Sequence, residues 1–217
     1  MTTTIHTSGD TETARKRYNR AARFYDVEQA VAERLVFRRL RREFWAKAPA
    51  VGSILEVGVG TGVNIGYYPG GAHVTAIDIS DQMLARARQR AERLHAAVDL
   101  ALMDAQHVEF PDATFDAVVS TCVFCSVPDP VAGLREAWRV LKPGGTLLLL
   151  EHMRSDNAVL GKVMDLVNPL VVRMSGANIN RRTLENVRRA GVQDFEASSH
   201  AFGIVKLIEA RKPAAEA

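Results

Sequence analysis

Cysteine is scarce in this chain of 217 residues: only Cys122 and Cys125 occur, spaced as Cys-x-x-Cys. A zinc site built from two such pairs would need two more cysteines. A redox pair of the thioredoxin kind would open a helix, whereas these two cysteines follow a predicted strand. We therefore predict that they line a pocket or pack in the interior, and no metal site is expected.

Long apolar runs are also missing from the sequence. No stretch of eighteen apolar residues occurs that could cross a bilayer as a helix. The first ten residues are polar and lack the apolar stretch of a cleavable signal. Apolar residues nevertheless make up 47% of the chain, which is enough to bury the core of one large domain. The expectation is a single-domain protein of the cytoplasm.

Positive charge is concentrated near the N-terminus. Residues 12–49 carry eleven Lys and Arg against five Asp and Glu, although the whole chain has a net charge of only +3. The pattern predicts helix over residues 13–48, with a break near Tyr25-Asp26. The second of these helices carries four arginines on one side: Arg34, Arg38, Arg41 and Arg42. A basic segment of this kind is compatible with an anionic membrane surface, a nucleic acid or water.

Apolar strand patterns alternate with helical patterns from residue 53 onward. Strands are predicted at 53–57, 73–77, 98–103, 115–120 and 146–151, and helices at 80–94, 130–141 and 182–190. Two further strands, 192–198 and 202–209, are predicted to close the sheet as a hairpin. This alternation predicts an α/β fold with a doubly wound, mainly parallel sheet of seven strands and right-handed crossovers. Residues 154–180 depart from the alternation.

A glycine-rich turn, Glu56–Gly62, follows the first of these strands. Its three glycines allow a tight turn and a close approach of the backbone to a ligand. Asp78 stands twenty residues after Gly58, at the end of the second strand, where a carboxylate can accept both hydroxyls of a ribose. A dinucleotide fingerprint would have its last glycine at position 63, which is Val63 here. The spacing therefore favours a nucleoside with an amino-acid tail over a pyrophosphate.

Three later features complete an ordered set of motifs. Asp104 ends the third strand and is followed by Ala105, Asp116 begins the fourth strand, and Leu141–Gly145 leads into the fifth. Together with the glycine turn, these motifs resemble the class I S-adenosylmethionine (SAM)-dependent methyltransferase family over about residues 50–152. The resemblance implies a Rossmann-like methyltransferase fold, with SAM as the methyl donor and S-adenosylhomocysteine as its product.

A narrower resemblance covers most of the chain, from Tyr18 to about residue 206. The segments that carry it are Thr121–Pro128, Glu151-His152, Asn168-Pro169 and Gly176–Arg181. They are similar to bacterial phospholipid N-methyltransferases, which convert phosphatidylethanolamine stepwise toward phosphatidylcholine. The same motifs are shared with C-methyltransferases of quinone precursors and with small-thiol S-methyltransferases. Both activities stay open as alternatives, as does a protein that binds SAM or a membrane without turnover.

The resemblance implies roles for individual residues. Those implied to bind the cofactor are Tyr25, Glu56, Gly58, Gly60, Asp78, Ile79, Met83, Asp104, Ala105, Thr121 and Ser126. His152 is the candidate proton acceptor, because it follows the fifth strand and titrates near neutral pH. Tyr18 and Tyr25 are candidates to orient the substrate nitrogen or to cover the cofactor. Arg181 is the candidate for the lipid phosphate, helped by Asn168 and Asn180.

Two parts of the domain are distinguished. Residues 1–49 are interpreted as an N-terminal helical lid that also contacts a membrane, and residues 50–212 as the methyltransferase core, with a substrate-binding insertion at about 154–180. Aromatic residues beside arginines suit a protein that lies on the inner face of a membrane without crossing it. A nucleic acid is not expected, because the basic segment lacks a base-stacking or Cys/His module. The expected partners are a phospholipid and an anionic membrane surface, and the oligomeric state is left open.

Overall fold

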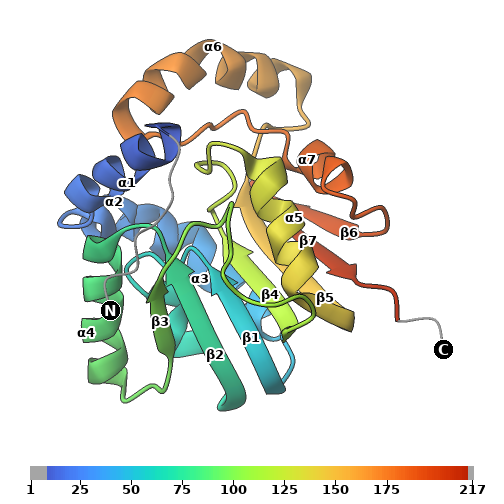
Figure 1. Cartoon of the computed structure of the whole chain (residues 1–217). Coiled ribbons are helices and arrows are strands. Elements are labelled where there is room, and N and C mark those ends of the chain that lie inside the picture. The colour runs from blue at the N-terminus through green and yellow to red at the C-terminus, as the bar shows by residue number, and fades with distance from the viewer. Residues whose placement is uncertain (1–8, 215–217) are drawn as a thin grey trace.

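Seven strands form one sheet in the computed structural model, which describes residues 9–214 except for the side chains of Glu28, Gln29, Ala32 and Ser175. The strands are β1 (Val51–Val57), β2 (Gly71–Asp78), β3 (Asp99–Leu102), β4 (Phe115–Thr121), β5 (Leu141–His152), β6 (Glu196–His200) and β7 (Val205–Arg211). Their order across the sheet is β3-β2-β1-β4-β5-β7-β6 (Figure 1). The first five strands are parallel, and β7 is antiparallel to both β5 and β6. The predicted sheet with its closing hairpin is confirmed.

Helices cover both faces of this sheet. They are α1 (Gly9–Ala21), α2 (Tyr25–Ala32), α3 (Arg38–Trp45), α4 (Asp81–Leu94), α5 (Pro130–Val140), α6 (Ala158–Ser175) and α7 (Thr183–Arg189), with a π-helical turn η1 (Glu33–Phe37) and a 3₁₀ turn η2 (Val63–Tyr67). Neighbouring residues of a strand point to opposite faces. Leu149 accordingly belongs to the core that includes Leu134 of α5, whereas Leu148 belongs to the core that includes Phe44 of α3. Leu148 and Leu149 are both fully buried, so helices cover each face of the sheet and the fold is doubly wound.

Local sequence signals fix several of these boundaries. Ser80 caps α4, because its hydroxyl accepts a hydrogen bond from the Met83 amide at 3.1 Å. The start of the fifth strand differs from the prediction, since β5 begins at Leu141 rather than at Thr146. A Cβ atom on Gly145 would lie 2.9 Å from the Asp116 carbonyl oxygen. Glycine here lets β5 approach β4 closely, so the strand continues through residues that usually form a turn.

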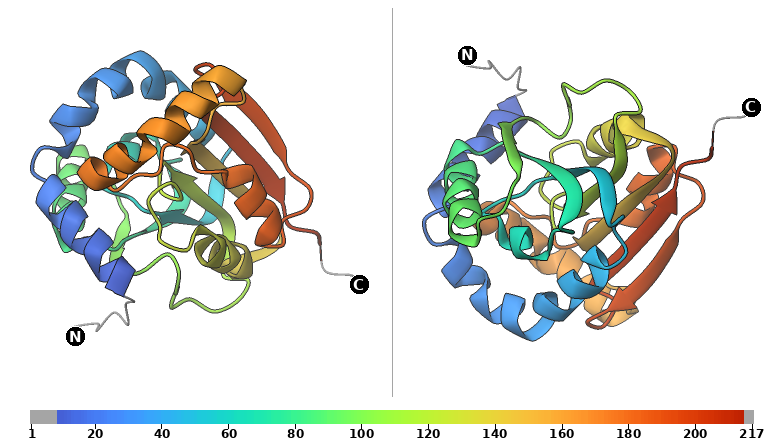
Figure 2. Two further views of the ribbon diagram at one scale, coloured as in Figure 1. Left: turned by 90° about the horizontal axis from the view of Figure 1, so that it is seen from above. Right: turned by 90° about the horizontal axis from the view of Figure 1, so that it is seen from below.

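The segment that departs from the alternation forms the longest helix, α6. Asn157 caps it, because its side-chain oxygen accepts hydrogen bonds from the amides of Val159 and Leu160 at 3.0 Å each. The helix ends at Gly176, whose φ of +83° is the left-handed conformation typical of a helix end. It crosses above the edge of the sheet (Figures 1 and 2). No helix within residues 9–214 is both long and apolar enough to span a bilayer.

The carboxyl ends of the five parallel strands meet at one edge of the sheet. Seen from above, α6 lies across this edge, and α1 and α2 curve around its side (Figure 2). Ligands of open α/β sheets bind at such an edge, where the strand order reverses. Here β1 lies between β2 and β4, so the reversal falls beside the glycine turn.

Candidate functional site

The glycine turn after β1 brings the backbone close to the loop that follows β4. Gly58 has a φ of +72°, and a Cβ atom on it would lie 2.2 Å from a methyl group of Val123. Gly60 has a φ of +55°, and a Cβ atom on it would meet nothing within 4 Å. Both positions therefore favour glycine for its backbone conformation. Gly60 faces open space, which is where a ligand can approach the backbone.

Asp78 stands at the end of β2 and faces the same space. Its Oδ2 accepts a hydrogen bond from the Gly60 amide at 2.8 Å, and its Oδ1 accepts one from the Ser80 amide at 2.9 Å. Burial raises the pKa of this carboxyl to about 6, although these amide bonds oppose the rise. The carboxylate is therefore ionised at neutral pH, with further lone pairs available for ligand hydroxyls.

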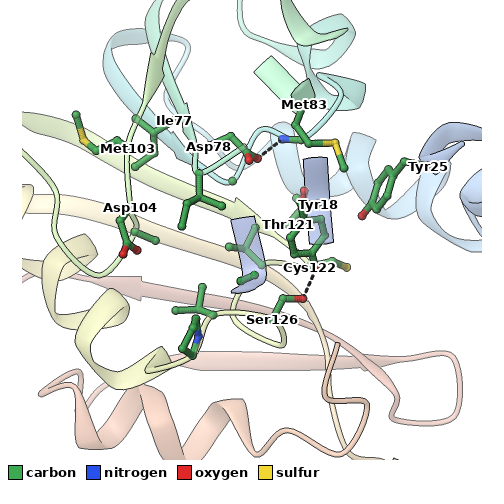
Figure 3. Close-up of a pocket in the computed structure, with 18 residues that line it drawn as sticks. Tyr18, Tyr25, Ile77, Asp78, Met83, Met103, Asp104, Thr121, Cys122 and Ser126 are labelled. Atoms are coloured by element: carbon green, nitrogen blue, oxygen red, sulfur yellow. Dashed lines mark hydrogen bonds between the residues drawn. The ribbon is translucent and has the colours of Figure 1, made fainter. Parts of the chain in front are cut away.

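These residues belong to a pocket at the strand ends, which we call the inner pocket. It encloses about 720 Å³ of space, part of which is open to solvent. Figure 3 shows the residues that line it. Its lining is Ala14, Tyr18, Tyr25, Gly58, Gly60, Ile77, Asp78, Ile79, Met83, Met103, Asp104, Ala105, Thr121, Cys122, Val123, Ser126, Val127 and Pro128. Ten of the eleven residues predicted to bind a cofactor are brought together here. Ile77 and Met103 were missed, although each directly precedes an aspartate at a strand end.

Glu56 is the predicted residue that does not line the inner pocket. It is fully buried, and its carboxylate accepts hydrogen bonds from Asn64 at 2.5 Å and from the hydroxyl of Tyr68. Burial raises the pKa of this carboxyl. The prediction that Glu56 contacts the cofactor is not supported by this position, because the side chain is used to fix the turn that follows β1.

The N-terminal helices close one side of the inner pocket. Tyr18 of α1 donates a hydrogen bond to Ser126 at 2.6 Å, and Asn19 accepts one from Ser80 at 2.5 Å. Asp26 of α2 forms an ion pair with Arg90 at 2.6 Å. Burial raises the pKa of Tyr18 and of Tyr25, so both phenols are neutral. These polar contacts dock the predicted lid on the core.

The two cysteines are free thiols beside this pocket. Cys122 lines it, and Cys125 is buried. Burial raises the pKa of both thiols, to about 12 for Cys125. Neutral thiols are poor nucleophiles and poor metal ligands, in keeping with lining and packing roles. Residues 9–214 contain no group of three or more His, Cys, Asp and Glu that could hold a metal ion.

A larger cavity, the outer cleft, adjoins the inner pocket and holds about 2800 Å³ of space including its mouth. Five residues line both cavities and form what we call the junction: Tyr18, Tyr25, Thr121, Cys122 and Ser126. His152 lines the outer cleft only, and burial lowers the pKa of its imidazole. Arginines dominate the remaining polar lining: Arg17, Arg20, Arg34, Arg38, Arg41, Arg90 and Arg173.

Arg41 has a position that the sequence did not predict. It was expected on a basic outer surface, but its side chain is only 11% exposed and pairs with Glu33 at 3.0 Å. Its Nη1 donates to Asn64 at 2.6 Å and to Thr121 at 3.0 Å. The π-helical turn η1 precedes α3, and Arg34, Arg38 and Arg41 line the outer cleft together. No sequence signal distinguishes Arg41 from its neighbour Arg42, which is exposed.

The three residues predicted to bind the substrate line neither cavity. Arg181 donates through Nη2 to the carbonyl oxygens of Cys125 at 3.2 Å and Val127 at 3.0 Å. Asn168 accepts a hydrogen bond from the Ile179 amide at 2.9 Å, and Asn180 donates to Asp165 at 3.1 Å. These contacts join the 176–181 segment to the loop after β4 and to α6. The predicted phosphate contact of Arg181 is therefore not supported.

Comparisons with known proteins point to one kind of chemistry. Residues 55–149 match the methyltransferase domain family. A phosphatidylethanolamine N-methyltransferase of Cereibacter sphaeroides is 41% identical over 114 residues, which cover 52% of this chain and 56% of that protein. A ubiquinone/menaquinone biosynthesis C-methyltransferase of Bartonella henselae is 37% identical over 56% of this chain and 50% of its own length. The chain thus spans about half the length of these two relatives. A thiol S-methyltransferase of Homo sapiens is 33% identical over 76% of this chain and 69% of its own length.

Solved structures share the same fold. A SAM-dependent methyltransferase from Thermotoga maritima superposes with a TM-score of 0.69 at 20% identity, covering 91% of this chain and 99% of that chain. A phosphoethanolamine N-methyltransferase 2 of Haemonchus contortus, solved with phosphomonomethylethanolamine and S-adenosylhomocysteine, also gives 0.69, at 18% identity. It covers 92% of this chain and 60% of that chain. At such identities the likeness concerns the fold alone.

Proposed function

Because this chain belongs to the class I SAM-dependent methyltransferases, we propose that it methylates the amine of phosphatidylethanolamine at a membrane surface, stepwise toward phosphatidylcholine. The cofactor is SAM, which supplies an electrophilic methyl group on a sulfonium when bound. The most identical stretch among the relatives described above belongs to an enzyme named for this substrate, and it covers half of this chain.

The residues of the inner pocket fit SAM. Asp78 offers an ionised carboxylate to the ribose hydroxyls, at the strand end that nucleoside-binding α/β sheets use. Asp104 accepts a hydrogen bond from the Gln106 amide at 2.9 Å and keeps lone pairs for an adenine amino group. Met83 supplies an apolar surface for a flat ring. Beside Gly58 and Gly60 the backbone can reach the methionine part of the cofactor.

The arginines that line the outer cleft are the observation that favours a phospholipid as the methyl acceptor. Two of the seven arginines are paired, Arg41 with Glu33 and Arg90 with Asp26. The other five have no carboxylate within ion-pair distance among the described side chains: Arg17, Arg20, Arg34, Arg38 and Arg173. A cleft of this charge attracts an acceptor that bears a phosphate. A neutral thiol or a quinone precursor without an anionic group makes no use of these arginines.

The acceptor nitrogen must lose a proton before it can be methylated. A primary amine with a pKa of roughly 10, by analogy with lysine, is mostly protonated at neutral pH. Positive charge around the cleft disfavours that ammonium form. We assign the removal of the proton to His152, because its lowered pKa keeps the imidazole neutral and able to accept. Tyr18 and Tyr25 at the junction orient the nitrogen as neutral hydroxyl groups.

Two rows of exposed apolar side chains lie on the helices beside the outer cleft. One row begins directly before α2 and continues along α2 and η1: Phe24, Val27, Val31 and Leu35. The other row lies on α6: Val159, Val163, Leu166, Leu170 and Met174. A peripheral enzyme buries such side chains in the interfacial region while basic residues meet the lipid phosphates. We infer that both rows contact the bilayer, which would bring the head group to the cleft.

Leu166→Glu should weaken binding to vesicles of phosphatidylethanolamine and phosphatidylglycerol by about tenfold or more. Leu166 is 81% exposed on α6, and burying a leucine contributes about 1.5–3 kcal/mol. Sedimentation with vesicles measures the effect. Leu94→Glu is the matched control, because Leu94 is 50% exposed at the end of α4 that leads away from the cleft. Equal vesicle binding by the two variants would show that α6 does not contact the membrane.

The function is tested by incubating the protein with SAM and vesicles that contain phosphatidylethanolamine. Mass spectrometry should detect lipids heavier by one, two or three methyl groups, and thereby show how far the series proceeds. Binding of S-adenosylhomocysteine, measured separately, shows that the protein is folded and that its cofactor site can bind ligand. If the protein binds this ligand but leaves the lipid unmodified, the phospholipid proposal is wrong, and quinone precursors and thiols become the acceptors to test.

A further inference from the structure

The last residue of β4, Thr121, and the residues that follow it up to Pro128 form what we call the 121–128 loop, which contributes a third of the inner pocket. Residues 121–128 supply six lining residues: Thr121, Cys122, Val123, Ser126, Val127 and Pro128. Three of the five junction residues belong to this loop. The backbone leaves the strand at Cys122 with a φ of +56°, a left-handed conformation that is uncommon for a residue other than glycine. Such a conformation persists only where neighbouring groups hold it.

Glu151 holds this loop from the neighbouring strand. The residue is fully buried near the end of β5. Its Oε1 accepts hydrogen bonds from the amides of Val123 at 3.0 Å and Phe124 at 3.3 Å, and from the hydroxyl of Ser120 at 3.4 Å. Successive amides after a left-handed residue form a concave site for an anion. Here the side-chain carboxylate of the protein itself occupies that site.

The other side of the loop is held by the segment after α6. The carbonyl oxygen of Cys125 accepts hydrogen bonds from the Asn178 amide at 3.0 Å and from Arg181, which also donates to Val127. The loop therefore lies between Glu151 on one side and Asn178 with Arg181 on the other. Of these, Glu151 is the group that binds the amides next to the left-handed residue.

The second carboxylate oxygen of Glu151 has no assigned partner. Among the described residues, Oε2 is buried and accepts no hydrogen bond. An unpaired buried carboxylate oxygen is costly, so a purely structural residue would more easily be replaced by an apolar one. Burial raises the pKa of this carboxyl to about 7, and a proton on Oε2 would leave the bonds of Oε1 intact. Glu151 touches neither cavity, so it is not itself a catalytic residue.

We propose that Glu151 is a positioning residue, whose Oε1 fixes the 121–128 loop so that Thr121, Cys122 and Ser126 stand at the junction. The inference requires only that the chain binds SAM and does not depend on the identity of the acceptor. A variant without the acceptor oxygen should bind the cofactor less tightly and expose the loop. A variant that keeps the oxygen should do neither.

The thiols of this loop report on its conformation, because the chain has only two cysteines and both lie in it. Glu151→Leu removes the acceptor oxygen at similar volume, and Glu151→Gln keeps it without the charge. For Glu151→Leu we expect thiol modification by dithionitrobenzoate to accelerate about tenfold or more, and S-adenosylhomocysteine affinity in calorimetry to fall by a similar factor. Glu151→Gln should stay within about threefold of the parent in both. Glu196→Leu, on the exposed surface of β6, is the matched control.

Two results would overturn the proposal. One is parent-like thiol reactivity and ligand affinity in Glu151→Leu, and the other is equal damage in Glu151→Gln. If Glu151→Leu does not fold, Glu151→Asp replaces it, because the shorter side chain keeps the charge but withdraws the oxygen from the Val123 amide. Parent-like thiol protection in Glu151→Asp would then contradict the proposal. None of these measurements uses a lipid, so their outcome is separate from that of the methylation assay.

Discussion

Asp78→Ala should weaken the binding of S-adenosylhomocysteine by about 100-fold or more. The substitution removes the carboxylate offered to the ribose, and a hydrogen bond to a charged group contributes about 1.5–3 kcal/mol. It also leaves the Gly60 and Ser80 amides without their acceptor, so the glycine turn loses its support. Isothermal titration calorimetry measures the affinity directly. Near-normal affinity in this variant would remove Asp78 from the ribose contact.

The pH dependence of binding gives a second test of the same group. The pKa of Asp78 is raised to about 6, and the ionised form is the one that accepts hydroxyl protons. Affinity should therefore be full at about pH 7 and above, and should fall as the pH is lowered through 6. Asp78→Asn cannot ionise, so its weaker binding should not change over this range. A parallel slope in the variant would assign the titration to another group.

His152→Ala should lower the turnover of methyl transfer by about 100-fold, the lower end of the range for loss of a general base. Its affinity for S-adenosylhomocysteine should not change, since His152 lines the outer cleft and not the inner pocket. Methylated lipid formed at saturating SAM measures turnover. His95→Ala, an exposed histidine at the end of α4, is the matched control.

The acid side of the pH–rate profile should identify the imidazole. Burial lowers the pKa of His152, and the neutral form is the one that accepts a proton. Turnover should therefore be retained through neutral pH and lost only as the pH falls through a value below the usual 6.5 of histidine. This limb should be absent in His152→Ala. If the acid limb persists unchanged in His152→Ala, another group accepts the proton and His152 only positions the substrate.

The sequence predicted the sheet and most of the inner pocket because both depend on local patterns. Each buried parallel strand is a continuous apolar run in the sequence. The pocket residues at the strand ends come immediately after these runs. The positions of Asp78 and Asp104 at strand ends could therefore be predicted from the sequence, whereas their contacts with a cofactor came from the family resemblance. The cap at Ser80 is equally local, since it depends on an amide three residues away.

Side chains whose partners come from distant segments could not be predicted in the same way. Arg181 is paired with carbonyl oxygens more than fifty positions earlier, and Arg41 with Thr121, eighty positions later. Charge alone suggests a phosphate or a membrane for either arginine. The folded chain instead uses their hydrogen bonds within the protein. Glu56 is a separate case, because its partners Asn64 and Tyr68 lie only 8 and 12 positions later, and they hold its carboxylate outside the pocket lining.

The π-helical turn at Glu33–Phe37 lies between α2 and α3 and sets how far α3 is rotated about the helix axis relative to α2. Tyr25 and Asp26, at the start of α2, must meet the inner pocket and its rim, whereas Phe44 and Trp45, at the end of α3, must fill the core. A continuous α-helix advances by about 100° per residue, and one extra residue in a turn offsets everything beyond it by that angle. The extra residue thus allows Tyr25 and Asp26 to face the cavities while Phe44 and Trp45 pack in the core. The length of this turn therefore sets which face of α3 packs on the core and which face, with Arg38 and Arg41, lines the outer cleft.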